Sequence, residues 1–174
     1  MTLLPLGAAL VTAGALAGQM GDAPYHGTPP EVVLAMLQLA ELRSGDVVYD
    51  LGCGDGRIVI AAVRTAGVRG VCVELHADRL RWARDAAEQA GVKDRIRFIQ
   101  GDLFEVPIGD ASVVTLYLLR AANLRLRPRL LKELRAGTRV VSSTFDMGDW
   151  EPERTVVVGE SPRTTLYRWT IPAR

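Results

Sequence analysis

Three glycines at alternate positions follow a short apolar run and a single carboxylate. The segment from Val47 to Arg57 reads VVYDLGCGDGR. Because glycine tolerates backbone angles and close ligand approach that other residues do not, the segment predicts a strand, a tight turn and then the N-terminus of a helix. This order of elements forms the nucleotide-type cradle of open α/β sheets.

The spacing of the glycines and the carboxylate before them indicate what kind of ligand the cradle binds. The spacing is G-x-G-x-G, whereas dinucleotide pyrophosphates are bound by G-x-G-x-x-G. The carboxylate would accept hydrogen bonds from a cationic or hydroxylated group and would repel a phosphate. We therefore expect a cofactor with an amino-acid end, bound by Asp50, Gly52, Gly54 and Gly56.

Two more carboxylates lie at the ends of the next expected strands. Glu74 closes the apolar segment 69–75, where an ionised carboxylate usually holds a ribose diol. Asp102 follows the expected strand 95–100 and would accept from an adenine amino group, while Leu103 would line the ring. A lone glycine turn is a weak signal, but carboxylates at three successive strand ends are a strong one.

Together these motifs resemble motif I and its successors in class I S-adenosylmethionine-dependent methyltransferases. More narrowly, the chain resembles the small protein-lysine methyltransferases typified by broad-specificity archaeal enzymes and mitochondrial ATP-synthase c-subunit methyltransferases. This similarity extends from Tyr25 to the C-terminus. It rests on the strings TPPEVV from Thr28, DLGCGDGRIVIAA from Asp50, VVTLYLL from Val113, LRPRLLKELRAGTRVVSSTF from Leu126, and Asp149-Trp150.

The resemblance implies S-adenosyl-L-methionine as the cofactor and a Rossmann-like class I methyltransferase fold. The periodicity agrees with it. We expect helices over 30–40, 58–66, 77–90 and 122–134, and strands over 47–51, 69–75, 95–100, 112–119, 138–145, 156–158 and 164–171. Strands that alternate with helices predict a mostly parallel sheet with helices on both faces, and the final hairpin adds an antiparallel edge.

The chemistry of methyl transfer points to aromatic residues on the acceptor side. Transfer from a sulfonium is an in-line displacement, so the enzyme mainly aligns donor and acceptor. A lysine amine must be neutral to attack, and an apolar channel favours the neutral form by desolvation. Tyr117 in the fourth strand is the candidate catalytic residue, with Phe145 and Trp150 as candidate substrate-binding residues whose ring faces would stabilise a methylammonium. The alternative is that all three are ordinary packing residues.

Three further residues have a functional and a structural interpretation. In the resembled family the segment before the first helix folds over the methionine end of the cofactor, so Tyr25 and Thr28 would contact it. Thr28 would otherwise be a helix N-cap. Asn123 either binds the substrate on the acceptor side or caps a helix. The chain departs from the family on that side: Arg120 replaces a common Pro, and Ser143-Thr144 replaces a common His-Asp pair.

Composition fits one enzyme domain over residues 22–174. The chain has 174 residues and a net charge of +1, so no global field attracts it to nucleic acid or membrane. Cys53 and Cys72 lack C-x-x-C spacing, and we expect small apolar fillers without a disulfide or a metal site.

Residues 1–21 are largely apolar, and no charged residue occurs between positions 2 and 21. A secretory signal would need a positively charged start, which is missing. A membrane anchor needs roughly 20 apolar residues, reached here only by including glycines, prolines and polar residues. Membrane association and a soluble N-terminal extension both stay open. Because S-adenosylmethionine is made and kept inside cells, we expect the domain to face the cytoplasm.

The identity of the acceptor has alternatives. Seven basic residues between positions 120 and 139 would form either a docking face for an acidic protein, an anionic membrane or RNA, or an ordinary solvated helix face. A protein substrate is the first expectation, and an RNA or small-molecule N-methyltransferase is the alternative. The fourth strand lacks the Asn/Asp-Pro-Pro-Tyr/Phe type of motif that grips a planar base nitrogen.

Overall fold

A computed structural model describes residues 27–173 of the chain, so the expected apolar extension 1–21 and Tyr25 lie outside the described residues. Within that range there are four α-helices: α1 (Pro30–Ala40), α2 (Arg57–Ala66), α3 (Ala77–Gln89) and α4 (Arg120–Glu133). The strands are β1 (Val47–Leu51), β2 (Arg69–Glu74), β3 (Ile96–Gln100), β4 (Val113–Leu116), β5 (Arg139–Ser143), β6 (Arg154–Val158) and β7 (Thr164–Thr170).

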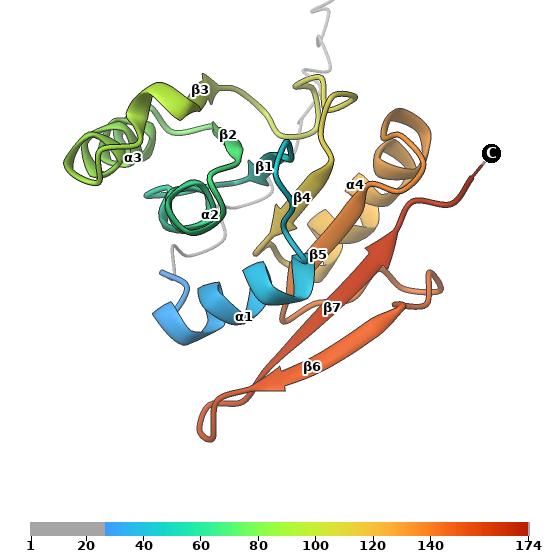
Figure 1. Cartoon of the computed structure of the whole chain (residues 1–174). Coiled ribbons are helices and arrows are strands. Elements are labelled where there is room, and N and C mark those ends of the chain that lie inside the picture. Colours follow the sequence, from blue (N-terminus) through green and yellow to red (C-terminus); the bar gives the residue numbers. More distant parts are fainter. Residues whose placement is uncertain (1–26, 174) are drawn as a thin grey trace, which may run out of the picture.

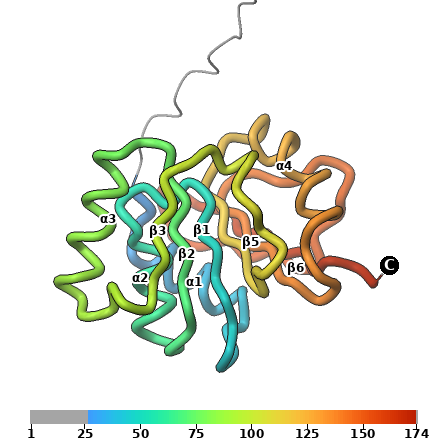
Figure 2. The backbone as a smooth tube through the Cα atoms, turned by 90° about the horizontal axis from the view of Figure 1, so that it is seen from above, coloured from blue at the N-terminus to red at the C-terminus, as the bar shows by residue number. Residues whose placement is uncertain are grey.

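The seven strands form one sheet in the order β3-β2-β1-β4-β5-β7-β6. The first five strands in this order are parallel, and β7 pairs antiparallel with both β5 and β6. The chain moves outward from β1 to β3 and then returns to the other side of β1 with β4 (Figures 1 and 2). In open α/β sheets, ligands bind beyond the carboxyl ends of the strands at such a switch point.

Helices cover both faces of the sheet, as expected. Figure 1 shows α1, α2 and α3 on one side of the strands and α4 on the other. The first core includes Val48, Val113 and Val141 beneath the three helices, and the second includes Tyr49 and Val114 beneath α4 and the connection 101–111. Neighbouring residues of one strand thus face opposite cores, because side chains alternate along a strand.

Several elements have other bounds than the sequence pattern predicts, and three of the differences bear on the acceptor side: two strands end earlier, and the helix expected over 122–134 begins two residues earlier. The fourth strand ends at Leu116, so Tyr117 follows the strand and does not lie within it. The helix after it begins at Arg120, because Leu119 is still extended at φ −69° and ψ 153°. The fifth strand ends at Ser143 because Thr144 adopts a left-handed φ of 73°. Both strand ends therefore open into turns that contain the candidate acceptor residues.

Candidate active site

Asp50 lies beside the switch point and is only 2% exposed. Its Oδ1 accepts a hydrogen bond from the Thr115 hydroxyl at 2.8 Å, whereas its Oδ2 is buried and has no hydrogen-bond partner within the described part of the chain. Burial raises the pKa of Asp50 to about 7, against the lowering effect of the Thr115 hydrogen bond. An unpaired buried carboxylate oxygen is costly, so the arrangement fits an ammonium group, which would restore the charged form.

The glycine turn passes directly over the end of β1. Gly52 has a φ of +82°, and a side chain there would approach the Leu118 Cδ2 to 2.9 Å. Gly56 has a φ of +77° at the N-terminus of α2, where a side chain would meet the Ala83 Cβ at 3.0 Å. Both positions therefore require glycine for their left-handed conformation, and at Gly56 a side chain would also be crowded.

Glu74 is the last residue of β2, and its carboxylate accepts hydrogen bonds from backbone N–H groups of two different turns. Its Oε2 accepts from the Gly54 N–H at 3.0 Å, and its Oε1 accepts from the His76 N–H at 2.9 Å. The side chain is buried, with 5% of the residue exposed. Each carboxylate oxygen accepts more than one hydrogen bond, so the group retains capacity for two hydroxyls of a ribose.

Asp102 and Leu103 lie in the connection that follows β3. The Asp102 Oδ1 accepts from the Phe104 N–H at 2.8 Å, so this carboxylate stabilises its own turn. Leu103 lies beside the glycine turn, because a methyl placed on Gly52 would be 3.7 Å from its Cδ2. Leucine side chains from 101–111 and from the end of β4 therefore flank the cradle.

The segment before α1 is attached to the glycine turn by a hydrogen bond from Arg57, which also forms an ion pair with Asp55. Arg57 donates from Nη1 to the Thr28 carbonyl at 2.9 Å and from Nε to the Asp55 Oδ1 at 2.9 Å. The N-cap of α1 is Pro29, and no side chain caps this helix, so the prediction of an N-cap at Thr28 is wrong. Arg57 and Asp55 were missed by the sequence reasoning, although their place in the string GDGR was a usable signal.

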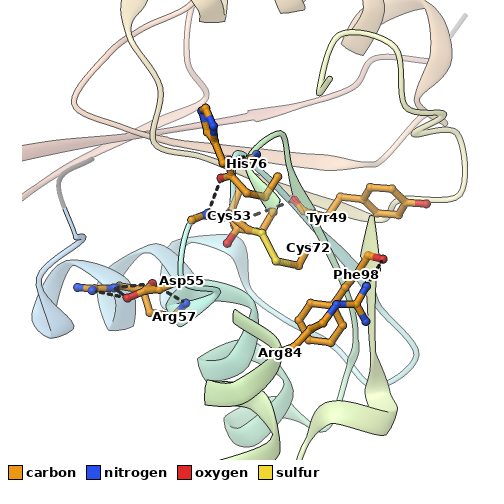
Figure 3. The surroundings of a disulfide bond; sticks show 12 residues. Tyr49, Cys53, Asp55, Arg57, Cys72, His76, Arg84 and Phe98 are labelled. Atoms are coloured by element: carbon orange, nitrogen blue, oxygen red, sulfur yellow. Dashed lines mark hydrogen bonds and ion pairs between the residues drawn. A yellow bond between two sulfur atoms is a disulfide. The ribbon is translucent and has the colours of Figure 1, made fainter. Parts of the chain in front are cut away.

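Cys53 and Cys72 form a disulfide, so the prediction of two unpaired apolar fillers is wrong (Figure 3). The parallel pairing of β1 and β2 places Cys72 beside Asp50. The Gly52 and Cys53 N–H groups both donate to the Val73 carbonyl, which folds the turn back over β2. The two Cα atoms are therefore 5.4 Å apart, within the range that a disulfide bridges. The sequence separation gave no sign of this return of the chain.

The candidate acceptor residues follow the adjacent ends of β4 and β5. Tyr117 is 36% exposed directly after β4, and Phe145 is half-buried two residues after β5. Trp150 is half-buried against Trp169, with ring centroids 5.6 Å apart, and its carbonyl accepts from the Trp169 Nε1 at 2.7 Å. Trp150 therefore has at least the packing role considered from the sequence. Whether these rings meet the acceptor stays a prediction.

Asn123 is completely buried in the first turns of α4. Its Nδ2 donates to the Ser142 hydroxyl and to the Phe145 carbonyl, each at 3.0 Å. Because the N-cap of α4 is Leu119, the prediction that Asn123 caps the helix is wrong. Asn123 instead joins α4 to the turn after β5.

The basic run in and after α4 is largely paired within the molecule. Arg120 contacts Asp146 at 3.2 Å, Arg127 contacts Asp149, Arg129 contacts Glu133 at 2.7 Å, and Arg139 contacts Asp46 at 2.5 Å. A further member, Arg125, lies over the Phe104 ring at 3.8 Å from its centroid. These contacts favour an ordinary helix surface over a wide cationic docking face.

Residues 27–173 contain no helix that is long and apolar enough to cross a membrane. Within the same range, no three His, Cys, Asp or Glu side chains are grouped closely enough to hold a metal ion.

The switch-point cradle, the unpaired oxygen of Asp50 and the doubly bound Glu74 define a class I S-adenosylmethionine-dependent methyltransferase. The model of the ANTKMT methyltransferase domain matches residues 50–154. The chain belongs to this family.

Relatives and solved structures agree on the class. A protein-lysine N-methyltransferase of Saccharolobus islandicus is 43% identical over 85% of this chain and 93% of its own length. The adenine nucleotide translocase lysine N-methyltransferase of Mus musculus is 36% identical over 79% of this chain, which spans 58% of that protein. A crystal structure described as an RNA methyltransferase from Salinibacter ruber with S-adenosyl-L-homocysteine superposes with a TM-score of 0.81 at 54% identity, over 86% of this chain and 95% of that one.

Proposed function

We propose that this protein transfers a methyl group from S-adenosyl-L-methionine to the side-chain amine of lysine in a protein. The main support is the similarity to the Saccharolobus protein-lysine N-methyltransferase, which extends over nearly the whole of both chains. The geometry of the acceptor side agrees, because the exposed Tyr117 and Leu119 follow the fourth strand and the half-buried Phe145 follows the fifth.

The donor site assigns one group to each end of the cofactor. The Asp50 Oδ2 would accept from the ammonium of the methionine end, and the Glu74 carboxylate from the ribose hydroxyls. The bound cofactor supplies an electrophilic methyl on its sulfonium. Tyr25 and Thr28 would cover the methionine end, and Asp102 with Leu103 would border the adenine. Gly52, Gly54 and Gly56 leave room for the backbone to approach it.

The acceptor side would act mainly by desolvation and alignment. Tyr117 is flanked by Leu118 and by Leu119, which is 47% exposed. A lysine that enters such surroundings loses hydration, so its neutral amine is favoured without a strong base. Tyr117 would orient the amine, and the rings of Phe145 and Trp150 would stabilise the methylammonium product.

RNA methylation is the second candidate, because the similar Salinibacter structure is described as an RNA methyltransferase. The ion pairs in the basic run argue against an RNA-binding face here. We place the reaction in the cytoplasm, where the methyl donor is made.

Radiolabelled S-adenosylmethionine and a cell lysate separate these candidates. Label that is lost on protease treatment, survives RNase and is recovered as methyl-lysine after hydrolysis is the expected result. Label that survives protease and disappears with RNase would show that RNA is the acceptor. Transfer to neither polymer would point to a small molecule. Asp50→Ala provides the control, since it removes the proposed ammonium-binding carboxylate.

A further inference from the structure

The turn after β5 has a backbone conformation that its sequence does not favour. Thr144 has a φ of 73°, and a β-branched residue is rarely found in this left-handed region. The Thr144 N–H donates to the Thr165 carbonyl at 2.7 Å, and the Phe145 N–H donates to the Ser143 carbonyl at 2.9 Å. Such a conformation persists only where surrounding groups hold it, and such strain is concentrated at functional sites.

Two buried side chains, Asn123 and Ser142, stabilise this turn by hydrogen bonds to the same carbonyl oxygen, that of Phe145. The Phe145 carbonyl accepts from the Asn123 Nδ2 at 3.0 Å and from the Ser142 hydroxyl at 2.8 Å. The Asn123 amide also donates to Ser142 Oγ. If the Asn123 amide were rotated by 180°, its oxygen would face Ser142 Oγ and the Phe145 carbonyl, which both accept hydrogen bonds here. These contacts therefore fix the orientation of the amide. Its Oδ1 is buried without a hydrogen-bond partner in the described structure.

The contacts of Asn123 join the two segments that border the acceptor side. Asn123 lies in the helix that begins three residues after Tyr117. Its hydrogen bonds end at Phe145, beyond the neighbouring strand. The relative placement of Tyr117 and Phe145 thus depends on one buried amide as well as on the sheet.

We propose that Asn123 is a positioning residue for methyl transfer, which holds the strained turn at Thr144 and so sets the Phe145 backbone relative to Tyr117. This role rests on the proposed function. It differs from the sequence-based expectation, in which Asn123 itself contacts the substrate. The donor site is formed by other strand ends, so the role concerns the acceptor and not cofactor binding.

The first test compares Asn123→Ala, which removes the hydrogen bonds of Nδ2 to Ser142 and Phe145, with the loss of a single buried hydrogen bond elsewhere. The control is Thr138→Val, which removes the hydrogen bond from the Thr138 hydroxyl to the Ala111 carbonyl near the other end of β5. For Asn123→Ala we expect kcat/KM for the labelled lysate protein to fall about 10- to 100-fold, since small misplacements at a reacting centre have effects of this size. Affinity for S-adenosylhomocysteine should change less than about twofold. The control should retain both properties.

A rescue experiment separates positioning from general stability. Glycine adopts a φ near 73° without steric cost, so the turn would keep its shape with less help from Asn123. Adding Thr144→Gly to Asn123→Ala should therefore recover part of kcat/KM. Trp150 reports on the same turn without substrate. In a Trp82→Phe background, with only Trp150 and Trp169 left of the three tryptophans, Asn123→Ala should increase acrylamide quenching and the added glycine should reduce it again.

The outcomes are distinguishable. If the unaltered enzyme transfers no label to protein lysine, the proposed function fails and this role fails with it. If it does, and folded Asn123→Ala keeps its kcat/KM, the positioning role alone is wrong. A parallel loss of cofactor affinity and melting temperature, without rescue by Thr144→Gly, would show that Asn123 only stabilises the fold and would also overturn the proposal.

Discussion

Replacing Asp50 by asparagine should make the ligand-free protein more stable at alkaline pH while it abolishes cofactor binding. Burial raises the pKa of Asp50 from 3.8 to about 7 in the folded state. Below about pH 4 both states are protonated and the carboxylate costs nothing. As the pH rises, the unfolded chain releases the proton while the folded protein keeps it, so unfolding becomes progressively easier. Above about pH 7 the penalty is constant.

The size of the effect follows from the same values. Each pKa unit corresponds to about 1.4 kcal/mol, so the ionised carboxylate costs the folded protein about 4 kcal/mol at pH 8. Asparagine has no charge, although its amide N–H groups would lack the acceptors that a buried donor needs, at a cost of roughly 1–3 kcal/mol. We therefore expect Asp50→Asn to be less stable than the original at about pH 4 and more stable at about pH 8.

Urea denaturation without ligand, measured from pH 4 to pH 8, tests this prediction. Asp46→Asn is a control of opposite sign. Burial alone would raise the pKa of Asp46, but hydrogen bonds from the Ser112 hydroxyl and the Arg43 N–H, together with Arg139, hold it below its ordinary value. Loss of that carboxylate should destabilise the protein by a nearly constant amount from about pH 5 to pH 8, because the contribution of a carboxyl with a lowered pKa falls off only below its ordinary value of 3.8. A stability difference for Asp50→Asn that stays constant with pH would refute the reasoning, as would retained tight binding of S-adenosylhomocysteine in calorimetry.

Three other perturbations have definite expected results. Arg57→Gln should weaken cofactor binding about tenfold by releasing the segment at Thr28, with the exposed Arg64→Gln as calorimetric control; equal affinities in both variants would contradict the attachment. The double replacement of Cys53 and Cys72 by serine should lower the free energy of unfolding by about 3 kcal/mol under non-reducing conditions. Reductant should produce the same loss in the original chain, and an unchanged denaturation midpoint would mean that the bond does not contribute. Tyr117→Ala should lower kcat about 10- to 100-fold with unchanged cofactor affinity, and full activity would exclude the catalytic assignment.

The sequence predicted the sheet and the class of cofactor well because both depend on local signals. Apolar runs that end in Asp50 and Glu74 are visible along the chain, and parallel pairing brings such ends together without further information. The disulfide was mispredicted because it depends on how the glycine turn folds back over β2. The hydrogen bonds of Asn123 were hidden for the same reason, since they depend on tertiary contacts between α4 and the turn at Thr144.

Glu74 constrains how the donor specificity of this protein can be changed. The carboxylate that we propose binds the ribose also accepts hydrogen bonds from the Gly54 and His76 N–H groups, which hold the glycine turn and the start of α3 in place. A variant made to accept a donor analogue with an altered sugar would lose two backbone hydrogen bonds together with the ribose contact. A substitution of Glu74 is therefore expected to change ribose binding and fold stability together. At Asp50 the two effects differ in sign, since Asp50→Asn is expected to abolish cofactor binding and to stabilise the ligand-free fold at about pH 8. Donor engineering should therefore leave Glu74 in place and alter the apolar side chains that flank the turn.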